Sequence, residues 1–168
     1  QRYSVGADQV IAIQLSQTPF YAESGGQVAD TGRIYNDECE FIVHDVQKID
    51  DAFIHYATLK SGTVSTKILT AEIDSSRRAD IARNHSTTHL LHTALRSVLG
   101  DHVQQKGSMV HADYLRFDFT HFQALTGSET NKVEDIVNTA FRDNMLISTD
   151  IQSIDEAKAS GATALFGE

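Results

Sequence analysis

The sequence predicts an α+β fold with two parts: a small antiparallel, β-barrel-like subdomain over residues 1–74, then a subdomain over residues 75–168 that forms an α/β sandwich of helices on an antiparallel sheet. Two observations carry this prediction. The first 73 residues hold short β-branched or alternating runs separated by turn-forming residues, a pattern typical of strands. Beyond them, helical and strand periodicities follow each other. At 168 residues, 40% of them hydrophobic, the chain can bury one large core or two small ones.

Four runs in the first subdomain are predicted strands: residues 9–15, 39–46, 53–56 and 65–73. Between the first two lie residues 18–32, which hold the only Pro and three of the ten Gly. Such a segment is usually a plain connection between strands, but its Gly25-Gly26 pair would also let backbone N–H groups approach a ligand closely. Because the segment lacks the G-x-x-x-x-G-K-[ST] pattern, no nucleotide phosphate site is predicted there.

Residues 76–99 are predicted to form an amphipathic helix that ends at Gly100. Its apolar groups recur every three or four residues, at Ile81, Thr88 (by its methyl group), Leu91, Leu95 and Val98. His85 and His89 lie one turn apart, close enough to share a metal ion, and His92 follows on nearly the same side. A His pair at this spacing is more often polar surface at a core edge, and no Glu follows His85 to give the metalloprotease pattern H-E-x-x-H. The pair alone therefore predicts no complete metal site.

Two further strands are predicted at residues 102–110 and 112–120. In the second, Leu115, Phe117 and Phe119 alternate with polar residues, so one face should pack on a helix while Arg116 and Asp118 form an ion pair on the other.

Thr126 and Glu129 have the spacing of a capping box before a second helix. The buried residues predicted for this helix are Val133, Ile136, Val137, Ala140 and Phe141. We expect a strand near residues 146–151 and then a short helix capped by Asp155 and closed by Gly161.

The charge balance limits the classes of partner. With 23 acidic and 14 basic residues, the net charge of −9 argues against binding nucleic acid by phosphate neutralisation alone, although Arg77, Arg78 and Arg83 cluster near one helix start. The single Cys39 excludes an internal disulfide and fits a reducing compartment. No apolar run approaches the roughly 18 residues of a membrane span. We expect a cytoplasmic protein and, because the chain begins with Gln1, a segment of a longer one.

Three stretches together resemble the editing domain of alanyl-tRNA synthetase and the free-standing editing proteins related to it. They are residues 18–32 (TPFYAESGGQVADTG), the His85-x-x-x-His89 helix, and residues 103–110 (VQQKGSMV) with the LRFDF that follows. Their order and spacing match along the chain, including the closing ALFGE. Detailed similarity in the first and third stretches favours the synthetase over the free-standing editor.

The resemblance implies hydrolysis of tRNA(Ala) wrongly charged with serine or glycine, at the ester to the terminal ribose. A synthetic site built for alanine cannot fully exclude smaller glycine or nearly isosteric serine, so a second site must remove them. The acceptor end of the tRNA would be the partner, and ATP binding would belong to the full-length enzyme. The resemblance implies zinc ligands at His85 and His89, catalytic roles for Gln105 and Thr88, and substrate contacts at Gly25, Gly26 and Ser108.

The sequence departs from the family in one respect. The resemblance implies that a Cys-x-x-x-His pair completes the zinc site, but this chain has none, and Cys39 lies in the first subdomain. We expect the missing ligands beyond Glu168, and weak zinc binding without them. Two other functions stay open: a free-standing deacylase acting in trans, which the sequence preceding Gln1 would distinguish, and a non-catalytic module that binds tRNA or a partner protein, which a deacylation assay would exclude.

Overall fold

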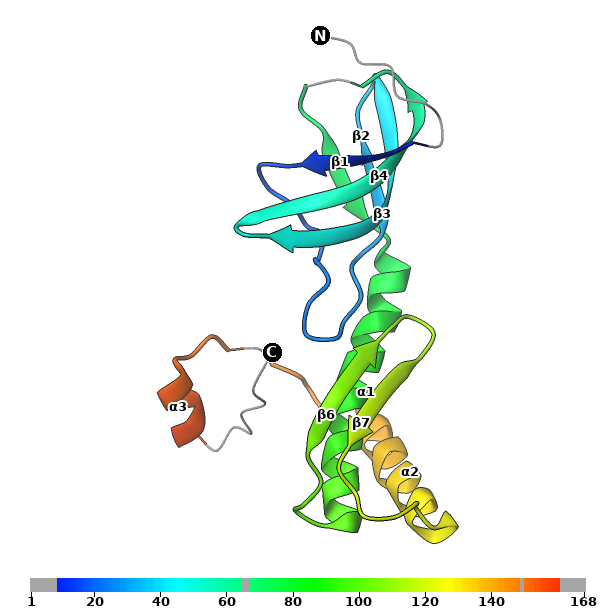
Figure 1. The fold of residues 1–168 in the computed structure, drawn as a ribbon, viewed down its shortest axis with the longest axis vertical. Helices are drawn as coiled ribbons and strands as arrows, with labels where there is room; N and C mark the ends of the chain where they lie inside the picture. Colours follow the sequence, from blue (N-terminus) through cyan, green and yellow to red (C-terminus); the bar gives the residue numbers. More distant parts are fainter. Residues whose placement is uncertain (1–8, 65–66, 149, 161–168) are drawn as a thin grey trace. The chain divides into compact units, whose positions relative to one another are not determined.

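A computed structural model of the protein describes residues 9–64, 67–148 and 150–160 (Figure 1). Packing divides the chain into a sheet unit, Gln1–His85 with Met109–Leu115, and a helical unit, Ser86–Ser108 with Arg116–Glu168. The long helix α1 (Ser75–Leu99) contributes residues to both units. The division into two subdomains predicted after residue 74 stays a prediction. No helix within the described ranges is both long enough and apolar enough to cross a membrane.

The sheet unit contains a five-stranded antiparallel sheet in the order β1-β4-β3-β2-β5. Its strands are β1 (Val10–Gln14), β2 (Gly32–Tyr35), β3 (Cys39–Ile49), β4 (Ala52–Gly62) and β5 (Thr70–Ile73). The antiparallel arrangement was predicted. Closure into a barrel was not found: in the described part of the chain β1 and β5 are the two edges of an open sheet.

Three strands of this sheet differ most from the prediction. β4 is longer than the predicted run at residues 53–56 because it pairs with the equally long β3 as a hairpin. Of the predicted run at residues 65–73, only Thr70–Ile73 forms a strand, and residues 65 and 66 lie outside the described part. The four-residue strand β2 was not predicted, because its pairing with β3 and β5 is a tertiary contact that so short a run does not reveal.

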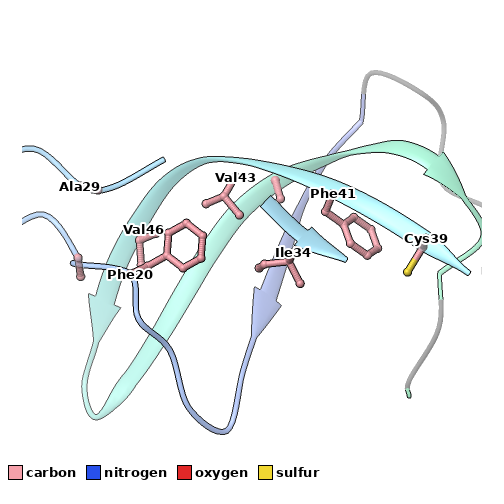
Figure 2. Packing of buried hydrophobic residues seen from close by; sticks show 9 residues of the cluster. Phe20, Ala29, Ile34, Cys39, Phe41, Val43 and Val46 are labelled. Atoms are coloured by element: carbon pink, nitrogen blue, oxygen red, sulfur yellow. The ribbon is translucent and has the colours of Figure 1, made fainter. Parts of the chain in front are cut away.

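The core of the sheet unit follows the alternation of β3 (Figure 2). Cys39, Phe41 and Val43 point into the core, as every second residue of a strand should. The next buried residue is Val46, so the alternation changes from odd to even positions. A register shift between Val43 and Asp45 explains the change, because one extra residue turns the following side chains to the other face.

In the helical unit, the second half of α1 packs against the hairpin of β6 (Gln105–Val110) and β7 (Leu115–Phe119) and against α2 (Gly127–Arg142) (Figure 1). The buried residues of this core are Ala94, Leu95, Val103 and Val133. Gly100 ends α1 as predicted, with φ at 114° and its N–H donating to the carbonyl of Arg96.

The alternation predicted for β7 is confirmed. Phe117 and Phe119 are partly buried against the unit's core, while Arg116 and Asp118 are exposed and form an ion pair with 3.1 Å between Nε and Oδ2.

The capping box of α2 is also confirmed. The Thr126 hydroxyl accepts a hydrogen bond from the Glu129 N–H, and the Glu129 carboxylate accepts one from the Thr126 N–H. The predicted buried stripe is confirmed only in part: Val133 is buried and Val137 packs against the core, but Ile136 and Phe141 are 39% and 44% exposed. Periodicity identifies the apolar face of a helix but not how much of that face is buried. Among the described residues, α1 and the β6–β7 hairpin cover only part of this face of α2.

The end of the chain corrects two further predictions. The strand expected at residues 146–151 is not seen in its described residues, where Leu146 and Ile147 are exposed and no neighbouring strand pairs with them. A short helix, α3 (Ile154–Ala159), does follow, but its cap is Ser153, whose hydroxyl accepts from the Glu156 N–H. The Ser-x-x-Glu spacing forms a reciprocal box that Asp155 cannot form. Gly161 lies outside the described residues.

Candidate functional site

Gly25 and Gly26 form the loop of a tight hairpin. The Ser24 N–H donates to the Gln27 carbonyl at 3.2 Å, and the Gln27 N–H donates to the Ser24 carbonyl at 2.9 Å. The two glycines have φ values of 57° and 80°, the positive values that a type I′ turn requires at both central positions. The backbone turn alone therefore explains the Gly-Gly pair. Contact of these residues with a substrate stays a prediction.

Residues 18–32 are held firmly against the sheet unit. The buried carboxylate of Asp30 accepts from the Tyr21 N–H at 2.7 Å and from Nε of Arg78 at 2.8 Å, and it also pairs with Nη2 of Arg78. This hydrogen bonding raises the pKa of Arg78. Phe20 is buried and packs edge-on against His55, with 5.3 Å between ring centroids. The segment is thus an ordered wall anchored by Phe20 and Asp30, despite its glycine content.

His55 fixes the start of the same segment. Its Nδ1–H donates to the Ile13 carbonyl at 2.9 Å, so Nε2 accepts from the Thr18 hydroxyl at 2.7 Å. The Thr18 oxygen in turn accepts from the Phe20 N–H at 3.1 Å. Burial lowers the pKa of His55 below its ordinary value of 6.5, more than the bond to Ile13 raises it. A neutral imidazole at the centre of the unit therefore ties residues 18–20 to β1 and β4.

The far side of the turn meets α1 through Gln27. Its backbone is bridged to Val110: the Val110 N–H donates to the Gly26 carbonyl at 2.8 Å, and the Val28 N–H donates to the Val110 carbonyl at 3.1 Å. The buried side chain of Gln27 places Oε1 2.8 Å from Nδ1 of His85. The residue that follows the Gly-Gly pair thus contacts one of the two candidate zinc ligands, and this contact lies wholly within the sheet unit.

The preceding residue of α1 also makes a positioning contact. The Asn84 amide donates to the carbonyls of His111 and Ala112, at 2.8 and 3.0 Å, and so ties the turn after β6 to the helix. Neither Asn84 nor Gln27 was predicted from the sequence to be a site residue. Their only signal is adjacency, since Asn84 precedes His85 and Gln27 follows the Gly-Gly pair.

Other candidate residues lie in the helical unit. The Gln105 amide donates to the Ser108 hydroxyl at 3.3 Å, so two residues expected to line one pocket are in contact. Thr88 is buried and His89 is exposed. His92 is buried with its ring centroid 5.3 Å from that of Phe117, in the core-edge position expected for it.

Whether the candidate residues share one cavity stays a prediction. Gly25, Gly26 and His85 belong to the sheet unit, and the others belong to the helical unit.

The described residues do not make a complete metal centre. Nowhere in the described ranges do three His, Cys, Asp or Glu side chains come close enough to hold one ion. His85 and His89 offer the neutral imidazole donors that zinc prefers, but a structural zinc site needs four ligands. The donor chemistry fits zinc and the number of donors does not, so zinc stays a proposal that requires ligands outside the described residues.

Comparison with known proteins finds a matching family model and numerous related sequences. A family model for class II tRNA synthetases (A) matches residues 2–77, which include the Gly-Gly turn and all five strands of the sheet. Over 159 residues the chain is 50% identical to an alanine–tRNA ligase of Rhodopseudomonas palustris. That match covers 94% of this chain and 18% of the ligase, so the chain spans less than a fifth of this relative.

Proposed function

Because the chain corresponds in sequence to a segment of alanyl-tRNA synthetases, we propose that it forms the editing region of such an enzyme and takes part in hydrolysing Ser-tRNA(Ala) and Gly-tRNA(Ala). The structural observation that most supports this is the contact between Gln27 and His85. It joins two of the three stretches on which the resemblance to editing domains rests, although 58 residues separate them.

In the proposed reaction, a water oxygen attacks the carbonyl carbon of the aminoacyl ester. The bond to the ribose oxygen then breaks, this oxygen takes a proton given up by the water and becomes a hydroxyl, and serine or glycine is released. The Gln105 amide can donate and accept, so it would hold the amino or hydroxyl group of the aminoacyl moiety or the attacking water, with Ser108 beside it. The Thr88 hydroxyl would contribute a second donor and acceptor.

His85 and His89 would hold a zinc ion together with ligands outside the described residues. When bound, the metal would orient the aminoacyl group, polarise its carbonyl or lower the pKa of a water molecule. The partner would be the acceptor end of tRNA(Ala) in the cytoplasm. With a net charge of −9, this chain would contact the tRNA only locally and not along an extended basic surface.

The test compares Gln105→His with Gln104→His, because Gln104 is an exposed neighbour in the same segment. Since the proposal places zinc ligands outside these residues, the assay uses the full-length polypeptide that contains this chain. The unmodified protein should deacylate Ser-tRNA(Ala) and Gly-tRNA(Ala) faster than Ala-tRNA(Ala). Gln105→His should slow deacylation of Ser-tRNA(Ala) and Gly-tRNA(Ala) about 100-fold, as expected when the reacting groups are no longer held in position. Gln104→His should leave both rates unchanged.

Two outcomes would refute the proposal. One is a full-length protein that binds zinc but does not distinguish Ser-tRNA(Ala) from Ala-tRNA(Ala). The other is an unchanged rate in Gln105→His, provided that thermal unfolding shows both variants to be folded.

A further inference from the structure

The bond between Gln27 and His85 determines which nitrogen of His85 can act. We propose that Gln27 is a positioning residue that fixes His85 in the Nδ1–H tautomer and in one ring orientation, so that His85 presents Nε2 to a divalent cation of the zinc class. The benefit to hydrolysis rests on the editing function proposed above, but the effect on His85 itself does not.

The chemistry of the two groups sets the direction of the bond. Oε1 of Gln27 is an amide oxygen, which accepts and cannot donate, so the proton at the 2.8 Å contact belongs to Nδ1 of His85. A neutral imidazole carries one N–H, and its lone pair is then on Nε2. Metals bind the nitrogen that carries the lone pair, and the partner of the other nitrogen fixes the ring.

Gln27 is well placed to hold this geometry because its backbone is restrained on both sides. The Gly25-Gly26 turn precedes it, and the bridge to Val110 joins it to β6. Gln27 is 8% exposed, so few water molecules can compete with His85 for its amide oxygen. The acceptor is also neutral, so it fixes the tautomer without introducing a buried charge.

His55 provides an internal reference in the same unit. It is also an Nδ1–H tautomer, but its proton goes to the Ile13 carbonyl and its Nε2 accepts from the Thr18 hydroxyl. Both nitrogens of His55 are therefore used within the sheet unit. Its tautomer does not depend on Gln27.

The experiment is long-range ¹H–¹⁵N correlation NMR of the 168-residue chain at a pH where its imidazoles are neutral. In the unmodified chain, Nδ1 of His85 should have the shift of a protonated nitrogen and Nε2 that of an unprotonated one. Gln27→Leu should lower the Nδ1–H fraction to below half, because the Nε2–H form is the preferred tautomer of an imidazole without such a partner. Gln27→Glu should retain Nδ1–H, since a carboxylate oxygen also accepts.

Gln104→Leu is the matched control, because it makes the same substitution at an exposed glutamine, and it should leave the tautomer of His85 unchanged. The His55 signals should be the same in every variant. Backbone amide spectra identify variants that have not folded. Titration with zinc chloride alone should shift the Nε2 signal of His85 in the unmodified chain and should shift it less in Gln27→Leu at the same zinc concentration.

An Nε2–H tautomer of His85 in the unmodified chain would overturn the inference, as would an unchanged tautomer in folded Gln27→Leu. If the tautomers behave as expected but the full-length protein shows no selective deacylation, the editing function fails while the positioning of His85 by Gln27 stands.

Discussion

Replacing Gly25 by Val tests whether the Gly-Gly pair serves the turn, the substrate or both. Gly25 has φ at 57°, in the left-handed region, where an L-residue costs about 1–2 kcal/mol because its Cβ crowds the following carbonyl. Valine, being branched at Cβ, belongs at the upper end of that range. Gly25 is itself exposed, so the strained backbone is the cost that this estimate counts. Asparagine tolerates the same region, so Gly25→Asn should lose less than about 0.5 kcal/mol.

The measurement is urea unfolding of the chain and its two variants, with the free energy of unfolding taken from the midpoint at constant slope. A loss of about 1–2 kcal/mol corresponds to a factor of roughly 5–30 in the ratio of folded to unfolded protein. Equal losses for Gly25→Val and Gly25→Asn, or no loss for Gly25→Val, would show that the positive φ is not what requires glycine at this position.

Deacylation by the full-length protein then separates turn from substrate. If the backbone of Gly25 approaches the aminoacyl group, Gly25→Asn should slow the reaction although the turn is intact. If glycine serves the turn alone, Gly25→Asn should react at the unmodified rate.

Three further predictions concern the Asp30–Arg78 pair, His55 and the zinc content of the chain. Asp30→Ala should lower the free energy of unfolding, measured in urea, by about 2–3 kcal/mol. This value lies between those of exposed and buried ion pairs, because Asp30 is buried but Arg78 reaches solvent. A smaller loss for Asp30→Ala than for Asp30→Asn would contradict the pairing. The pKa of His55 is lowered, so the unfolded chain takes up its proton near pH 6.5 while the folded chain does so only at lower pH. The contribution of neutral His55 to the free energy of unfolding is therefore complete above pH 6.5 and is lost as the pH falls through the pKa of His55 in the folded chain. The unfolding temperature is measured against pH, and the same pH dependence in His55→Gln would refute this. Metal analysis after dialysis should find well below one zinc ion per molecule, because two histidine ligands alone bind zinc weakly. One zinc ion per molecule that is lost when His92 is replaced would show that the ligands are wrongly assigned.

The parts of the fold that the sequence predicted are those with strong local signals. Helix α1 has an apolar repeat without Pro or Gly and a terminal Gly100, β7 has strict alternation, and the Thr126–Glu129 capping box is a four-residue pattern. Each of these depends on neighbours close in sequence.

The parts that were missed depend on tertiary contacts. The pairing that makes β2 a strand comes from β3 and β5, and exposure of Ile136 on α2 depends on what covers that face. Ser153 and Asp155 both suit the end of a helix, and only the reciprocal bond to Glu156 decides between them.

The same distinction applies to the candidate site. His85, Gly25 and Gly26 stand out in the sequence because a His pair at helical spacing and a Gly-Gly pair are unusual. Gln27 does not, because one glutamine has no pattern, and its partner His85 lies 58 residues away along the chain. Only the folded sheet unit reveals that the two meet.

This contact changes the interpretation of the Gly-Gly motif. A type I′ turn reverses the chain within two residues, and its twist suits an antiparallel pair, so the next residue leaves the turn in a defined direction. Here that residue is Gln27, whose backbone is then bridged to Val110 while its side chain binds Nδ1 of His85. If Gln27 positions His85 as proposed, the two glycines act on His85 through the residue that follows them. A substitution that relaxes the turn should then change the Nδ1–H fraction of His85, measured by the same NMR experiment, before it disturbs the fold of the sheet.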